Sequence, residues 1–189
     1  LWWIPSRKGK FDVRSYYRTL VCNNVSPFPW KSIWRTKAPL KVAFFAWAAA
    51  LGKILTLDNL RRRHVIVINR CCMCKRHEET VDHLLLHCEV ACAIWNVFFS
   101  RFGLSWVMPL RVVDLFACWW TGGRSRNAVV WKMVPSCLMW CLWRERNDRT
   151  FEDQERTLEE LKSFFFFTLF VECKNVNVFL CDSFGNINQ

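Results

Sequence analysis

The sequence predicts a mostly α-helical protein: a small helical domain stapled by three cysteines and one histidine around zinc, followed by a further helical region. Apolar residues recur at helical intervals through much of the chain, and one short segment has the spacing of a metal site. Twelve Trp and 16 Phe among 189 residues supply a large apolar core, which argues against disorder.

Before the cysteine-rich segment we expect helices with one short extended piece and one short strand. These elements span, in chain order, residues 10–13, 15–21, 30–35, 39–51, 57–63 and 64–69. Pro39 suits the first position of its helix, which Gly52 ends. Thr56 should cap the helix at 57–63, and the β-branched run HVIVIN predicts the strand. The helix at 39–51 has apolar residues at spacings of four, three and four, namely Leu40, Phe44, Trp47 and Leu51.

Four further helices are expected after the segment. They lie at 90–102, between Pro109 and Gly122, at 127–149 and at 157–170. Ala91, Trp95 and Phe98 share one side of the first, so this helix should pack across the metal segment. Pro135 leaves open whether 127–149 is one helix or a pair, because an interior proline removes a backbone donor.

The metal site is predicted at Cys71, Cys74, His83 and Cys88, which follow the pattern C-x2-C-x8-H-x4-C. Structural Zn²⁺ takes four thiolate or imidazole ligands in a tetrahedron, and two cysteines separated by two residues can fold around one ion through a tight turn. This set leaves no open position, so the site is interpreted as structural. The alternative is that these cysteines are buried free thiols.

A short helix should present the second pair of ligands. Thr80 is the expected cap and Asp82 lies in the first turn, which predicts a helix at 81–87. His83 and Cys88 are five residues apart, which is about 140° around an α-helix. Both can reach one ion only if the helix ends near His87.

Several nearby residues compete as ligands, and we expect none of them to bind the ion directly. They are Cys72, His77, His87 and Cys92.

The net charge of +11 lies entirely in the first third of the chain. Residues 1–63 contain thirteen Lys or Arg and two acids, whereas residues 64–189 contain fourteen of each sign. This asymmetry favours binding to a polyanion, and RNA or DNA contacted through phosphates without sequence preference is the expected partner. A solvated basic face, or one that packs on an acidic domain, is the alternative. The predicted contact residues are Lys37, Lys41, Arg61, Arg62 and Arg63.

Aromatic residues lie among these basic side chains, and unpaired bases could stack on them. For Trp30 and Trp34, however, we favour a place in the core.

No catalytic machinery is apparent, so the chain is predicted not to be an enzyme. Polymerase and nuclease chemistry need clustered carboxylates around two metal ions. We interpret the adjacent acids Glu78–Glu79, Glu152–Asp153 and Glu159–Glu160 as solvated. Eleven cysteines, an odd number without a regular disulfide framework, indicate a reducing compartment, hence the nucleus or cytoplasm. No apolar run is long enough for a membrane span.

A family resemblance rests on the segment CCMCKRHEETVDHLLLHCEVACAIWNVF and on the preceding WKSIWRTKAPLKVAFFAWAAALGKILTLDNLRRRH. The flanks WWIPSRKGKFDVRSYYRTL and MWCLWRERNDRTFE agree with it. The chain resembles, over about residues 2–163, the zinc-binding domain downstream of the reverse transcriptase in plant LINE-type (non-LTR) retrotransposons. The resemblance implies zinc binding at Cys71, Cys74, His83 and Cys88.

We therefore expect three regions: a zinc-binding domain with basic N-terminal helices at 1–102, a Trp-rich helical extension at 103–170, and a tail of unknown structure at 171–189. The predicted function is a structural zinc module of a retrotransposon reverse transcriptase that contacts nucleic acid. The alternatives are a scaffold that docks on the polymerase domain of the same polyprotein and an inactive remnant of such an element. Since the chain begins without Met, we expect it to be a fragment or a piece of a larger polyprotein.

Overall fold

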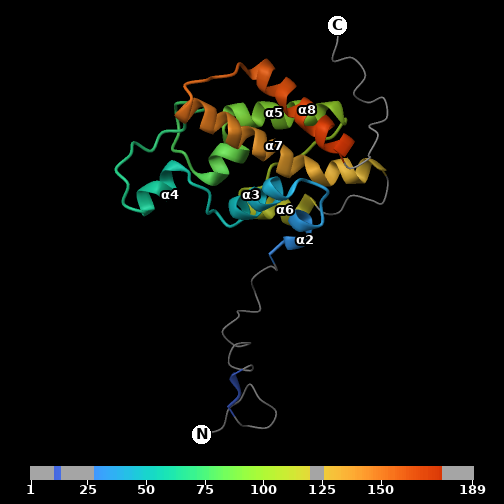
Figure 1. Ribbon diagram of the computed structural model, residues 1–189, viewed down its shortest axis with the longest axis horizontal. Helices are drawn as coiled ribbons and strands as arrows, with labels where there is room; N and C mark the ends of the chain where they lie inside the picture. Colours follow the sequence, from blue (N-terminus) through green and yellow to red (C-terminus); the bar gives the residue numbers. More distant parts are fainter. Residues whose placement is uncertain (1–10, 14–27, 120–125, 176–189) are drawn as a thin grey trace.

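The computed structural model describes residues 11–13, 28–119 and 126–175 (Figure 1), and within them every regular element is a helix. These elements are α2 (Trp30–Trp34), α3 (Leu40–Ala50), α4 (Leu57–Arg62), η1 (His83–His87), α5 (Glu89–Arg101), α6 (Val112–Trp119), α7 (Arg126–Phe151) and α8 (Leu158–Asn175). The mostly α-helical fold class is thus confirmed. The helix expected at 15–21 and the tail from 176 onward lie outside the described residues, and the extended piece expected at 10–13 is described only from residue 11.

The long helix α7 runs through the middle of the molecule, where α8, α3 and η1 pack against it (Figure 1). Residues 133–139 are buried on every side, which is the pattern of a helix inside a core. The helix continues through Pro135, so 127–149 is one helix and not a pair.

One hydrophobic core reaches from Ile33 in α2 to Cys173 in α8, and it includes Cys71 and Cys88 of the metal segment. Trp95 and Trp119 lie on opposite sides of the predicted boundary at residue 102, and their ring centroids are 5.8 Å apart. The division into two domains there stays a prediction.

The strand expected at 64–69 is wrong. These residues form a loop with no regular structure, in which Ile66 is 100% and Ile68 is 86% exposed. Strand propensity expresses how well a side chain packs on a pleated sheet, and the described part of the chain offers this run no sheet.

The helix α3 forms where its periodicity predicts, but three of the four apolar residues that mark it are exposed, and only Trp47 packs partly against the core. Leu40 is 81%, Phe44 58% and Leu51 42% exposed. The buried side consists mainly of small residues, together with Phe45, whose ring lies 5.3 Å from Trp140 and 5.7 Å from Trp143 of α7. Ala43, Ala46 and Ala49 lie on this buried side, and α7 packs against α3.

The expectation that Trp30 and Trp34 lie in the core is also wrong. Trp30 is 49% and Trp34 is 42% exposed, whereas their neighbour Ile33 fills the core position of α2. No described helix is both long and apolar enough to cross a bilayer.

Candidate metal centre

The first two ligands sit on a tight turn. The Lys75 N–H donates to the Cys71 carbonyl at 2.8 Å, and the Cys71 N–H donates to the His77 carbonyl at 2.8 Å. Lys75 adopts a φ of 56°, a left-handed conformation that costs a side-chain-bearing residue roughly 1–2 kcal/mol. The turn brings Cys74 back toward Cys71. The two hydrogen bonds of the turn offset the backbone strain at Lys75.

The second pair of ligands comes from a widened helical turn. The Thr80 hydroxyl accepts the His83 N–H at 3.1 Å, which confirms Thr80 as the cap. From His83 to His87 the helix is a π-helix, and the Cys88 N–H donates to the His83 carbonyl five residues back at 2.6 Å. A π turn holds more residues than an α turn, so His83 and Cys88 return toward the same side of the helix. The helix ends at His87, as the predicted geometry required.

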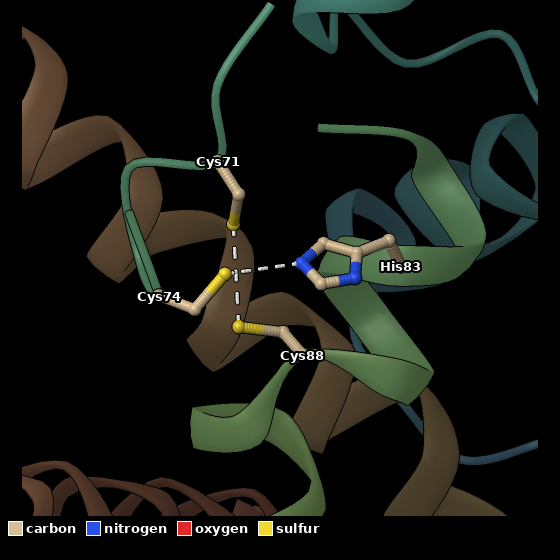
Figure 2. Close-up of side chains that lie close together, drawn as sticks. All are labelled: Cys71, Cys74, His83 and Cys88. Atoms are coloured by element: carbon tan, nitrogen blue, oxygen red, sulfur yellow. Dashed lines mark hydrogen bonds between the residues drawn. The ribbon is translucent and has the colours of Figure 1, made fainter. Parts of the chain in front are cut away.

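The four predicted residues converge on one point (Figure 2). Their ligand atoms all lie within 4.8 Å of one another, with Cys71 Sγ 4.0 Å from Cys88 Sγ and Cys74 Sγ 3.4 Å from His83 Nε2. A tetrahedral Zn²⁺ with Zn–S of about 2.3 Å and Zn–N of about 2.0 Å needs S···S of about 3.8 Å and S···N of about 3.5 Å. The donor set and its spacing therefore fit a zinc ion.

Electrostatics at the centre favour a cation. A hydrogen bond with Cys88 lowers the pKa of Cys71 to about 5, and the same bond together with burial raises the pKa of Cys88. Both residues are fully buried, and their sulfurs lie 4.0 Å apart. A divalent ion bound at this site would displace the thiol protons, because a coordinating thiol loses its proton outright.

The four competing residues make other contacts. Cys72 Sγ lies 3.9 Å from the Arg146 carbonyl, and burial raises its pKa to about 11. His87 Nε2 lies 3.0 Å from the Leu110 carbonyl, and Cys92 Sγ lies 3.3 Å from the Leu86 carbonyl. His77 is exposed, with its ring 5.4 Å from that of His83. Among the described residues, the group that can hold a metal contains none of these four.

Glu79 ties the metal segment to the rest of the molecule, and its interpretation as a solvated acid is wrong. The side chain is 0% exposed and pairs with Arg146 of α7, which donates from Nε at 3.2 Å and from Nη2 at 2.9 Å. The same carboxylate oxygen accepts the Leu57 N–H at 3.1 Å and thereby caps α4. Thr56, the predicted cap, makes no such bond and donates to Asp58 instead.

A second set of polar contacts holds the CxxC turn against the end of α7. Arg149 donates to the Met73 carbonyl at 3.3 Å, and its guanidinium also pairs with Glu145, which is buried. Lys75 pairs with Glu155 at 3.0 Å, and this contact together with Arg149 lowers the pKa of Glu155. The turn is therefore fixed from outside as well as by its own ligands. Sequence reasoning missed Glu79, Arg146 and Arg149, because nothing local distinguishes them from other charged residues.

The predicted nucleic-acid contacts are all exposed and fall into two separate groups. Lys37 and Lys41 lie at the start of α3, whereas Arg61, Arg62 and Arg63 lie at the end of α4. Figure 1 shows α4 at one edge of the molecule, where the loop at 51–56 connects it to α3. Arg62 also pairs with Asp58 at 3.4 Å.

Comparison with known proteins agrees with this centre. A sequence model of the family described as zinc-binding in reverse transcriptase matches residues 11–95, which contain all four converging residues. The match supports that family for this part of the chain.

A curated relative extends further along the chain. It is the Arabidopsis thaliana protein named "Putative ribonuclease H protein", 25% identical over 174 residues. The alignment covers 85% of this chain but 26% of that protein, so the chain spans about a quarter of its relative's length. No solved structure gives a significant match.

Proposed function

We propose that the chain is the structural zinc module of a retrotransposon-type reverse transcriptase and that it contacts RNA or DNA through its basic N-terminal part. The convergence of Cys71, Cys74, His83 and Cys88 carries the proposal, supported by the family match over residues 11–95. The plant LINE type is part of the proposal, supported by the Arabidopsis relative.

In this proposal the four residues hold Zn²⁺, and the ion supplies structure and no reaction. Three thiolates and one imidazole fill a tetrahedron, so no position is left for water or substrate. The CxxC turn and the π turn would otherwise be joined by weak contacts alone. We therefore propose an accessory, non-catalytic role for this chain, whereas ribonuclease H activity is named only for the longer relative.

Phosphate contact is proposed at Lys37, Lys41 and the three arginines of α4. Guanidinium forks match phosphate oxygens and stay charged, and all five side chains are exposed. Because the two groups lie apart, they would reach different stretches of one strand or duplex. Such contacts read the backbone and not the bases, so binding should tolerate any sequence.

One observation favours a second function, that of a scaffold docking on the polymerase domain of the same polyprotein. The loop at 64–69 exposes Ile66 almost completely and Ile68 nearly so. Exposed branched apolar side chains on a protruding loop are suited to insertion into an apolar pocket of a protein partner.

The test is binding of the zinc-loaded chain to RNA and DNA over a range of salt concentrations. The logarithm of the affinity should fall with the logarithm of salt, with a slope of about −0.9 per phosphate neutralised on duplex DNA. Replacing Arg61, Arg62 and Arg63 by Gln should make that slope shallower. An affinity independent of salt, or no binding by the zinc-loaded chain, would contradict the nucleic-acid function. If the chain then becomes more soluble in the presence of the polymerase domain, and Ile66→Ser abolishes this gain, the result would favour the scaffold.

A further inference from the structure

The helices α2 and α3 share an outward surface of aromatic rings, which we call the aromatic face: Trp30, Trp34, Phe44 and Trp47. Trp30, Trp34 and Phe44 are 49%, 42% and 58% exposed, far more than large rings require when a core is available. Trp47, which is partly buried against the core, links two of them, since its ring centroid lies 6.3 Å from that of Trp34 and 5.5 Å from that of Phe44. Trp34, Trp47 and Phe44 therefore form one continuous group of rings, and Trp30 lies four residues before Trp34 in α2.

Two cations lie over the Trp30 ring. Lys31 Nζ is 5.7 Å and the Arg35 guanidinium carbon 5.6 Å from the centre of the Trp30 ring. Residues 28–57 contain five basic side chains and no acid. α6 packs against both helices, and its acid Asp114 is held by two hydrogen bonds from Arg111. The aromatic face thus combines ring surface with net positive charge.

This combination fits a single-stranded nucleic acid better than a protein. Proteins that bind single strands place aromatic rings for stacking beside basic side chains that follow the backbone, and each stacked base contributes about 1–3 kcal/mol. Protein interfaces, in contrast, are depleted in lysine. Four of the five basic residues in 28–57 are lysines: Lys31, Lys37, Lys41 and Lys53.

We propose that the aromatic face is a stacking site for unpaired bases of single-stranded RNA or DNA, with the phosphates beside Lys31, Arg35 and Lys41. A duplex cannot use the site, because its base faces are already stacked on one another. The inference rests on the proposed nucleic-acid function and deepens it. In this proposal α2 and α3 make the protein prefer single strands, whereas α4 contacts phosphates alone.

The experiment compares Trp30→Ala/Trp34→Ala with the parent chain, both loaded with zinc. Three probes are used: a short oligothymidylate, an abasic strand of equal length and a duplex. We expect the double variant to bind the oligothymidylate at least about 5-fold more weakly, the effect of one lost stacking contact. Affinity for the abasic strand and the duplex should stay within about twofold.

Phe167→Ala is the matched control, because Phe167 is a 64% exposed ring on α8, outside the aromatic face. It should leave all three affinities unchanged. Equal losses on the oligothymidylate and the abasic strand would overturn the proposal, as would no loss on either when zinc content and helical circular dichroism are retained. If the parent chain binds no probe, the proposed function itself fails. If the parent chain binds and the double variant binds equally well, the proposed stacking site is wrong while the nucleic-acid function stands. The aromatic face would then be assigned to contact with a protein partner.

Discussion

In the metal segment, residues 71–88, four ligand atoms point toward one another, whereas on the aromatic face three rings point away from the core. The metal segment is specified by short spacings within eighteen residues, so its geometry follows from local turns. The aromatic face depends on which side of α3 meets α7, and that choice depends on residues about a hundred positions away. The spacing of ligands along the chain therefore predicts the metal site more directly than helical periodicity predicts which side of α3 is buried.

Loss of one metal ligand should destabilise the protein more than any other single substitution proposed below. Cys74→Ser removes a thiolate from a site whose metal binding in small zinc peptides is worth about 10–16 kcal/mol at neutral pH. We expect loss of bound zinc and faster amide exchange, greatest at 65–102, while α7 and α8 keep their own core. Hydrogen exchange by mass spectrometry, read beside metal content, measures both.

Cys92→Ser is the matched control, since Cys92 lies close to the cluster but its sulfur contacts the Leu86 carbonyl. It should keep its zinc. Full zinc content and unchanged exchange in Cys74→Ser would show that the ligand set is wrong.

The buried ion pair joins the metal segment to the core, and breaking it should have the next largest effect. Arg146→Met leaves Glu79 buried without its cation, which costs about 3–5 kcal/mol of unfolding free energy. Arg76→Met breaks the exposed pair with Glu89 and should cost about 0–1 kcal/mol. Urea unfolding measures both variants. Equal costs would mean that Glu79 is not held as the structure shows.

Two adjacent residues of α3 test which side of that helix is buried. Phe45→Ala should cost about 3–5 kcal/mol, because it removes a ring packed on Trp140 and Trp143. Phe44→Ala should change the unfolding free energy by no more than about 0.5 kcal/mol, because that ring is mostly exposed. The reverse order in thermal or urea unfolding would mean that α3 is rotated and that the aromatic face is the core.

The cap of the π turn should have the smallest effect. Thr80→Ala removes the hydroxyl that accepts the His83 N–H, at a cost of about 1 kcal/mol. Thr80→Ser retains the acceptor and should restore most of the stability. A loss shared equally by both variants in urea unfolding would assign the effect to the Thr80 methyl group and not to the cap.

The fold class, most helix positions and the four converging residues could be predicted from the sequence. Each depends on neighbours within a few turns, as the Thr80 cap and the CxxC turn illustrate. The π turn could not be predicted, because an α-helix with the same residues differs from it by one hydrogen-bond register. The burial of Glu79 and the orientation of Trp30 and Trp34 were also missed, since both depend on distant packing partners. The HVIVIN loop shows the same limit: its strand propensity had no partner strand among the described residues.

X-ray absorption spectroscopy of the purified, zinc-loaded chain tests the central claim most directly. The account predicts one bound Zn²⁺ with three sulfur ligands at about 2.3 Å and one nitrogen at about 2.0 Å. A shell with fewer than three sulfurs, an oxygen ligand from water, or a folded chain that retains no zinc would contradict it.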